Sequence, residues 1–354
     1  MKIGLVRRGY SRTGGAEAYL LRFAETAVAS GHEALLFSEQ WPRDAWPWEH
    51  VQIHSRSPRQ FADSLRARRA NAACDCLFSL ERVWGCDVYR AGDGVHAAWM
   101  ERRAQFEPFW KPWLRRFNRK HLELLALERH LLGPEGAGLV IANSHLVKAE
   151  IERRFAFPAE GIRVVYNGVP PYSPAPDARL ATRRELGLRT EDYVLLFAGS
   201  GWERKGLRFA MSAVNALPSS ARLLVAGRGS TRGLPESRRT RFLGPVPEMA
   251  RYYAAADAFV LPTLYDPFSN ACLEALAAGL PVITTQHNGF AEIIQPGGQG
   301  EVVADPRDSM ALVRAIEAWR DPARRTPLRP QLQGLGARFT LAANARQTLA
   351  IIAG

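Results

Sequence analysis

The sequence predicts an α/β protein built from two doubly wound, Rossmann-like domains, each around a parallel sheet. Short apolar runs alternate with helical patterns along the chain, which is typical of parallel strands joined by helices. The 354 residues, 47% of them hydrophobic, are enough for two domains of ordinary size with substantial cores. A stretch rich in proline and turn residues, 167–176, predicts the linker between them.

The apolar runs predict buried strands in both domains. In the first domain they are 3–6, 34–37, 139–142 and 164–166, and in the second 193–198, 223–226, 259–261 and 282–284. We expect the domains to span 1–168 and 169–336, followed by a last helix within 337–354. Because 320–336 is rich in proline, arginine and glycine, we expect it to be a surface crossing.

The charge balance predicts an anionic partner. The formal net charge is +12 and the pI is about 10, which suits nucleic acid, a membrane surface or a phosphorylated substrate. Nucleic acid is the weaker choice, because the sequence shows no RNP motif, zinc finger or basic zipper.

The cysteines and the apolar runs predict a cytoplasmic protein. The spacing of the four cysteines matches no zinc site; they are Cys74, Cys76, Cys86 and Cys272. So few cysteines in a long chain indicate buried, reduced thiols. No apolar run is long enough to span a bilayer, and the N-terminal apolar run is too short for a signal peptide.

The most informative segment is 265–285, which predicts a loop, a short helix ending at Gly279 and a buried strand from Pro281. Asp266 and Glu274 bracket the start of the helix. A helix N-terminus favours an anion, because its free N–H groups and its dipole both attract negative charge. Carboxylates would repel a phosphate, so we expect them to accept hydrogen bonds from neutral hydroxyls. A phosphate flanked by two polyols is a sugar nucleotide.

This segment resembles the donor-site signature of retaining glycosyltransferases with the GT-B architecture. The family signature ends in Gly-x-Pro-Val, which follows an acid, two residues, a Gly and a Leu-Glu-Ala run. In this chain Asp266 replaces the usual Glu and Ser269 replaces the usual Gly. The resemblance implies two doubly wound sheets facing each other across a cleft, with the last helix returning to the first domain. It also implies that Asp266 holds donor-sugar hydroxyls, Glu274 the ribose hydroxyls, and the N–H groups around Ser269, Asn270 and Ala271 the diphosphate.

A second motif, 199–207, follows a predicted strand and contains Arg204 and Lys205. Glycines allow close backbone approach and the two cations suit a diphosphate, although a solvated loop would also explain them. The family has Arg-Lys-Gly here, with both cations reaching the donor diphosphate. Many members carry an Arg where this chain has Ser200. The similarity is greatest to the branch that builds the inner core of lipopolysaccharide.

The first domain offers fewer specific signals. The loop before the first helix lacks the GxGxxG fingerprint, and Gly14 and Gly15 fit either a phosphate-facing helix start or a flexible turn. The resemblance places this loop over the donor diphosphate and the acceptor, an Asp at the position of Asp93 near the reaction centre, and Asn167 at the hinge. Turn chemistry explains Asp93 and Asn167 equally well. We expect His96 to be an ordinary surface or core histidine.

Two further contacts follow from the resemblance alone. Segments 241–244 and 252–257 resemble the region around the nucleobase, which implies a base contact near Arg228 and Phe242. Glu292 resembles a family Gly-Glu element near the donor, and a helix-cap acid would explain it as well.

The segment 102–121 is basic and aromatic. Cations interleaved with aromatic anchors suit an interfacial helix on anionic lipid, whereas an amphipathic helix with inward aromatics is the alternative. In the lipopolysaccharide-core branch a basic region of the acceptor domain touches the membrane. The residues concerned are Arg102, Arg103, Lys111, Arg115, Arg116, Arg119 and Lys120, with Phe106, Phe109, Trp110, Trp113 and Phe117.

These observations predict a retaining hexosyltransferase that moves glucose or a related hexose from a UDP-sugar to a lipid-linked, phosphorylated saccharide such as lipopolysaccharide inner core. We expect it at the cytoplasmic face of the inner membrane. No Asp-x-Asp motif follows a strand, so neither a metal nor another cofactor is expected. The alternatives are a transferase of capsule or exopolysaccharide synthesis, an epimerase of the same fold, a dinucleotide oxidoreductase and a basic nucleic-acid-binding protein.

Overall fold

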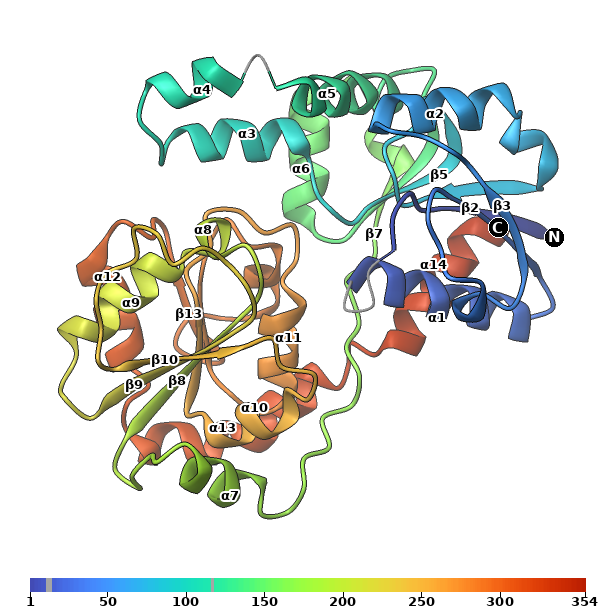
Figure 1. Ribbon diagram of the computed structural model, residues 1–354. Coiled ribbons are helices and arrows are strands. Elements are labelled where there is room, and N and C mark those ends of the chain that lie inside the picture. Colours follow the sequence, from blue (N-terminus) through green and yellow to red (C-terminus); the bar gives the residue numbers. More distant parts are fainter. Residues whose placement is uncertain (11–14, 116–117) are drawn as a thin grey trace. The chain divides into compact units, whose positions relative to one another are not determined.

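The computed structural model describes residues 1–10, 15–115 and 118–354. The chain forms two compact units (Figure 1). Unit 1 comprises Met1–Tyr166 and Leu341–Gly354, and unit 2 comprises Asn167–Thr340. Among the described residues, no helix combines the length and the apolar character needed to cross a bilayer.

Unit 1 is built on a parallel sheet with the order β3-β2-β1-β4-β5-β6-β7. The four predicted strands are present, the last shifted from 164–166 to 162–164, whereas β3, β4 and β5 were not predicted. Those three are short or interrupted by polar residues such as Asp87. The strands are β1 (Lys2–Val6), β2 (Glu33–Ser38), β3 (Glu49–Gln52), β4 (Cys76–Ser79), β5 (Cys86–Ala91), β6 (Ala137–Ala142) and β7 (Ile162–Val164).

The segment 102–121 does not form the single helix that both interpretations of the sequence assumed. It is divided among α3, α4 and α5, because Pro108 follows the end of α3 and Asn118 caps α5 by accepting from the N–H of His121. The helices of unit 1 are α1 (Gly15–Ala29), α2 (Pro58–Ala67), α3 (His96–Ala104), α4 (Trp110–Arg115), α5 (Arg119–Leu131), α6 (His145–Arg154) and α14 (Leu341–Ala353), with 3₁₀ turns η1 (Arg43–Ala45), η2 (Ala70–Ala73) and η3 (Ala159–Gly161).

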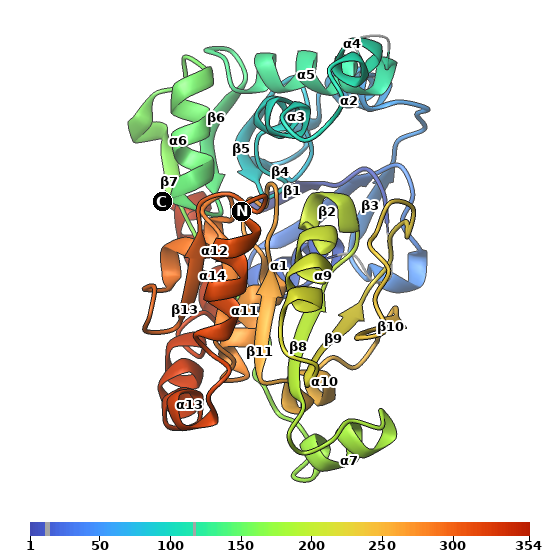
Figure 2. The ribbon, with the colours of Figure 1, turned by 90° about the vertical axis from the view of Figure 1, so that its left-hand side faces the viewer.

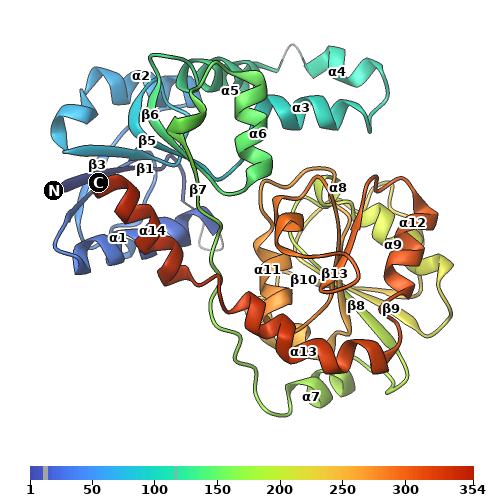
Figure 3. The ribbon, with the colours of Figure 1, turned by 180° about the vertical axis from the view of Figure 1, so that it is seen from behind.

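The last helix, α14, packs against α1 in unit 1 (Figure 3). The Tyr19 hydroxyl lies 3.2 Å from the Thr348 hydroxyl. The Asn344 side chain donates to the Tyr166 carbonyl at 2.6 Å. These bonds join the C-terminal helix to the point where the chain leaves unit 1.

Unit 2 has a parallel sheet with the order β10-β9-β8-β11-β12-β13 (Figure 2). All four predicted strands of this unit are confirmed. Their apolar runs were recognisable in the sequence because parallel strands are buried on both faces of the sheet. The strands are β8 (Tyr193–Ala198), β9 (Ala221–Ala226), β10 (Thr240–Gly244), β11 (Ala258–Leu261), β12 (Val282–Thr285) and β13 (Gly300–Val303). The helices are α7 (Ala178–Glu185), α8 (Trp202–Lys205), α9 (Leu207–Ala216), α10 (Ala250–Ala255), α11 (Asn270–Ala277), α12 (Ser309–Glu317) and α13 (Pro322–Gly336), with the 3₁₀ turn η4 (Gly289–Ile293).

The expected surface crossing at 320–336 is instead helix α13. Asp321 caps it by accepting from the N–H of Ala323 at 2.8 Å, and Pro322 occupies the first turn, where a missing N–H is harmless. The helix packs on α11 and buries Leu332, so tertiary packing outweighs the two prolines inside it.

A buried carboxylate holds the helical layer of unit 1 to its sheet. Glu128, on α5, is 2% exposed and accepts from Arg82 Nε at 2.9 Å. It also accepts from the backbone N–H groups of His96 at 2.7 Å and Ala97 at 2.9 Å. Glu128 therefore caps α3 from a neighbouring helix and neutralises the buried Arg82.

Replacing Glu128 with alanine should lower the free energy of unfolding of unit 1 by about 3–5 kcal/mol, because Arg82 would keep an uncompensated charge. Urea denaturation followed by circular dichroism measures this loss. The control is Glu135→Ala, an exposed carboxylate just beyond α5, which should change the free energy by less than about 0.5 kcal/mol. Equal midpoints for the two variants would contradict the capping role.

Candidate functional site

The strand order of unit 2 defines where a ligand is expected. The chain runs from β8 through β9 and β10 on one side, and then places β11 on the other side of β8. Ligands of open α/β sheets bind at the carboxyl ends of the strands, where the order reverses. The loops after β8 and β11 contain the residues that the sequence singled out.

The loop after β8 brings two cations to this edge. It continues into the single turn α8, which ends with Arg204 and Lys205. Gly206 follows with φ 76°, and a Cβ there would overlap the carbonyl oxygen of Pro262. Only glycine fits this close approach to the end of β11. The Trp202 ring N–H donates to the Gly199 carbonyl at 3.1 Å and closes the loop.

Arg204 joins the two loops through both its backbone and its side chain. Its carbonyl accepts from the N–H of Leu264 at 2.8 Å and from the hydroxyl of Thr263 at 2.9 Å. Its guanidinium donates to the Tyr265 carbonyl at 2.9 Å. The position of the first cation is therefore fixed by the loop that contains the first carboxylate.

Asp266 and Lys205 form an ion pair that the sequence did not predict. Arg204 Nη1 lies 3.9 Å from the other oxygen of the Asp266 carboxylate, and Asp266 is only 4% exposed. The Asp266 N–H donates to the His287 carbonyl, and its own carbonyl accepts from Gly289 N–H. Both predicted diphosphate cations therefore lie beside the predicted sugar-binding acid.

Helix α11 begins at the predicted place, with Ser269 as its cap. The Ser269 hydroxyl accepts from the N–H of Cys272 at 3.4 Å. No acceptor among the described residues contacts the N–H groups of Asn270 or Ala271. The Asn167 side chain donates to that of Asn270 at 2.8 Å, so the residue expected at the hinge belongs to this helix start in unit 2.

Glu274 lies one turn into α11 and has a partner that sequence reasoning missed. The Tyr253 hydroxyl, on α10, donates to Glu274 Oε2 at 2.8 Å. Burial raises the pKa of Glu274, and the bond from Tyr253 partly opposes this rise. Burial and the nearby carboxylate raise the pKa of Tyr253 well above its usual value, so the phenol keeps its proton. A separation of 21 residues leaves no sequence signal for this pair.

The two residues expected near the nucleobase lie around the glycine-rich loop. Phe242 is 43% exposed, and its ring centroid lies 5.2 Å from that of Trp202. The N–H of Arg228 donates to the Ser200 hydroxyl at 3.3 Å. Glu292 is exposed within η4, which is capped by Asn288 and not by Glu292.

The first-domain candidates Asp93 and Gly15 both lie in unit 1. Asp93 follows β5, is 61% exposed in its side chain and lies 3.9 Å from Arg7, which also pairs with Glu17 and Glu81. Gly15 opens α1 and is exposed, whereas Gly14 lies outside the described residues.

His96 has a specific environment in unit 1. Its Nε2 lies 3.1 Å from Nδ1 of His121. Burial and the nearby Arg82 lower the pKa of His96 to about 4, so it stays neutral at physiological pH.

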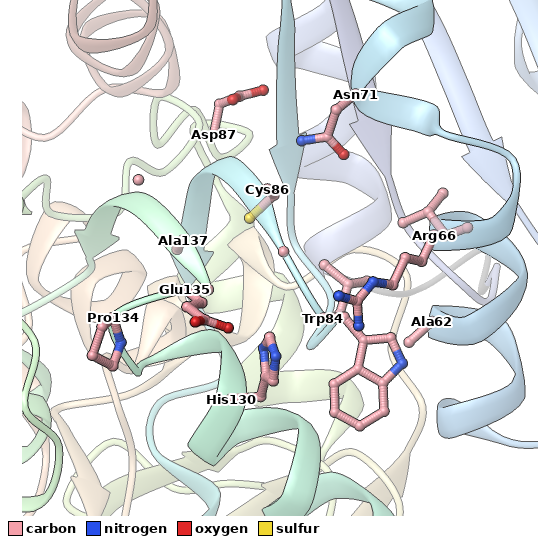
Figure 4. A pocket seen from close by; sticks show the side chains of 15 residues that line it. Ala62, Arg66, Asn71, Trp84, Cys86, Asp87, His130, Pro134, Glu135 and Ala137 are labelled. Atoms are coloured by element: carbon pink, nitrogen blue, oxygen red, sulfur yellow. The ribbon is translucent and has the colours of Figure 1, made fainter.

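Unit 1 contains a cavity of about 450 Å³ at the amino ends of β5 and β6. Figure 4 shows Trp84, Cys86 and His130 among the residues that line it. Ligands of open α/β sheets bind at the opposite edge, so this cavity does not belong to the candidate site.

The chain matches two family models, one after the other along the sequence. Residues 13–172 match the family described as Glycosyltransferase Family 4. Residues 192–321 match the family described as Glycosyl transferases group 1.

Curated relatives align over nearly the whole chain. The lipopolysaccharide glucosyltransferase WaaG of Escherichia coli (strain K12) is 27% identical over 343 residues, which are 90% of this chain and 89% of WaaG. A D-inositol 3-phosphate glycosyltransferase of Thermobispora bispora is 27% identical over 95% of this chain and 89% of its own length.

Solved glycosyltransferases share the fold. The crystal structure of WaaG superposes with a TM-score of 0.83 at 23% identity, covering 99% of this chain and 100% of WaaG. Anabaena Alr3699/HepE in complex with UDP-glucose gives 0.76 at 18% identity, covering 100% and 99%. These likenesses show a GT-B fold of two Rossmann-like domains. Together with the family matches, they show that the chain belongs to the GT-B glycosyltransferases of the family 4 type.

Proposed function

We propose that this glycosyltransferase moves a hexose, with glucose as the first candidate, from a UDP-sugar to a lipid-linked, phosphorylated saccharide such as lipopolysaccharide inner core. The observation that carries the proposal is the grouping of Arg204, Lys205, Asp266 and the start of α11 at one edge of unit 2. Two relatives support the choice of sugar: WaaG is named a lipopolysaccharide glucosyltransferase, and HepE was solved with UDP-glucose.

The leaving diphosphate gains negative charge as the glycosidic bond breaks. Arg204 and Lys205 would stabilise that charge, together with the N–H groups of Asn270 and Ala271 at the positive end of α11. The ion pair with Asp266 holds Lys205 in position before the donor binds. Because these groups supply the positive charge that a divalent ion supplies elsewhere, we propose that the reaction needs no metal.

The two carboxylates would bind hydroxyls. Asp266, already paired with Lys205, keeps lone pairs for hydroxyls of the donor sugar, and Glu274 accepts from the ribose while Tyr253 orients it. Neither carboxylate is assigned the acid or nucleophile role of a hydrolase. We propose a retaining transfer in which the donor phosphate itself takes the acceptor proton.

Unit 1 presents an aromatic surface that suits a membrane. Three aromatic side chains around α4 are exposed: Phe109 by 92%, Trp110 by 48% and Trp113 by 59%. They do not pack inward, as an amphipathic helix with solvated charges would require. Lys111, on α4, is exposed as well. We propose that this surface docks on the cytoplasmic face of the inner membrane, where a lipid-linked acceptor is available.

The direct test is release of UDP from UDP-glucose with and without lipopolysaccharide inner core. A transferase releases UDP at a rate that depends on the acceptor and yields a product heavier by one hexose in mass spectrometry. UDP-glucose converted to another UDP-hexose without acceptor would indicate an epimerase, which would contradict the proposal.

Arg204→Gln and Lys205→Met should each lower kcat by tenfold or more, while UDP-glucose affinity changes less. Charge on the diphosphate grows toward the transition state, and each charge-assisted contact contributes about 1.5–3 kcal/mol. Steady-state kinetics beside calorimetric donor binding separates the two effects. Arg208→Gln, an exposed cation at the start of α9, should match wild type. An increase in the donor KM at unchanged kcat would make these residues binding aids only.

The affinity for UDP-glucose should fall as the pH is lowered, beginning above the usual pKa of a glutamate. Only the ionised Glu274 accepts two ribose hydroxyls, and burial raises its pKa. Glu274→Gln should weaken binding by about 1–3 kcal/mol and flatten the profile. Tyr253→Phe removes the hydrogen bond that lowers the Glu274 pKa, so the loss of UDP-glucose affinity should begin at a higher pH.

Calorimetric titrations at a series of pH values measure how the affinity for UDP-glucose depends on pH. UDP-glucose is a suitable ligand because its diphosphate diester stays ionised at all of these pH values. Glu248→Gln, an exposed carboxylate before α10, should keep the wild-type profile. An unshifted profile in Tyr253→Phe would show that Tyr253 does not position Glu274.

The triple variant Phe109→Ser, Trp110→Ser, Trp113→Ser should lose co-sedimentation with phosphatidylglycerol vesicles at high salt. Salt screens the cations but not apolar insertion. The control is Leu180→Ser with Met310→Ser, two exposed apolar residues of unit 2. Activity on a short soluble acceptor should survive in both. Equal vesicle binding by the triple variant and wild type would rule out docking through this surface.

A further inference from the structure

Unit 1 contains a large cavity at the carboxyl side of its sheet that the donor chemistry does not use. Its volume is about 1,090 Å³, and it lies where α2 and α5 begin. These neighbouring helices are visible in Figure 2. Arg8, which follows β1, reaches the same space. Five of its lining residues are cations, namely Arg8, Arg56, Arg59, Arg119 and Lys120.

The acids of the lining neutralise only one of these five cations, Arg119. Asp63 accepts from the Trp84 ring N–H at 2.6 Å. Glu123 pairs with Arg119 at 3.0 Å and accepts from the backbone N–H of Arg59 at 3.3 Å. Asp63 and Glu123 are the only acids of this lining, and both are already engaged.

Three of the cations have no ion pair within the described residues. These are Arg56, Arg59 and Lys120, and neither gap in the described range, 11–14 or 116–117, contains an acidic residue. The guanidinium of Arg59 lies over the Trp84 ring, 5.8 Å from its centroid. Cations gathered without counter-charges repel one another, and a bound anion would relieve that repulsion.

The polar groups of the lining fit a phosphorylated sugar. Guanidinium groups match phosphate oxygens in pairs. The carbonyl oxygen of the Gln60 side chain accepts from Arg56 N–H at 2.8 Å, which leaves its amide N–H groups for sugar hydroxyls. The cavity lining includes no aromatic residue, whereas single-stranded nucleic acid needs aromatic rings for base stacking. The volume exceeds what a single phosphate ion fills.

We propose that this cavity is the subsite that binds phosphate groups of the saccharide acceptor, with Arg56 and Arg59 as its principal ligands. The identity of the acceptor rests on the proposed function. The site itself requires only a sugar that bears more than one phosphate. It is distinct from the aromatic surface around α4, which would contact lipid.

The test titrates the full-length protein with glucose 1,6-bisphosphate in the presence of saturating UDP, which keeps the probe out of the donor site. Wild type should bind the bisphosphate and not glucose. Arg56→Gln with Arg59→Gln should weaken this binding at least tenfold, without changing the affinity for UDP. The matched control, Arg129→Gln with Arg153→Gln, removes two exposed cations of α5 and α6 and should bind as wild type does.

A transfer assay separates this proposal from the proposed function. The Arg56, Arg59 variant should raise the KM for phosphorylated core saccharide at least tenfold and leave the KM for UDP-glucose unchanged. Bisphosphate binding without any transfer would support the subsite and contradict the proposed function.

Other outcomes would overturn the subsite itself. They are absent bisphosphate binding by wild type, equal weakening in the two double variants, and an equal loss of phosphatidylglycerol-vesicle or single-stranded DNA binding. A loss of vesicle binding or of DNA binding would make the cavity part of a general lipid or nucleic-acid surface. Thermal melting of each variant confirms that the fold is intact.

Discussion

The site in unit 2 depends on the contact between the loop after β8 and the loop after β11. The carbonyl of Arg204 accepts from the second loop, its guanidinium donates to Tyr265, and Lys205 pairs with Asp266. Asp266 is nearly buried, so its charge is stabilised by these cations and not by water. Two cations and one acid therefore hold each other in place, which is the preorganisation that electrostatic catalysis requires.

The same loop also fixes the start of α11 and, through it, Glu274. Asp266 bonds through its backbone to His287 and Gly289, which follow β12. The side chain of Asn288 accepts from the N–H of Ser269 at 3.2 Å, so the helix cap is held by that third loop. Three strand ends thus determine where the N–H groups of α11 point. Glu274 follows one turn later, where a change in the cap would displace it.

Sequence patterns revealed the elements that are uniform and missed those that depend on contacts through space. The apolar runs of β8, β9, β11 and β12 were recognisable because both faces of a parallel sheet are buried. Strand β5 was not recognisable, because Asp87 and Arg90 interrupt its apolar run. The Asp87 carboxylate accepts a hydrogen bond from the N–H of Leu77 on β4 at 2.7 Å. The Lys205–Asp266 pair, 61 residues apart, and the Tyr253–Glu274 bond have no local pattern.

The two departures from the family signature lie at the ends of one short loop, and the structure gives each a physical consequence. Asp266 has a shorter side chain than the usual glutamate, and Lys205 pairs with it directly. Ser269, in place of glycine, accepts the N–H of Cys272 and so removes one of the free donors at the helix start. The N–H groups of Asn270 and Ala271 remain for an anion. A diphosphate site with fewer backbone donors would rely more on its side-chain cations, so the proposed function makes the position of Lys205 its most sensitive feature.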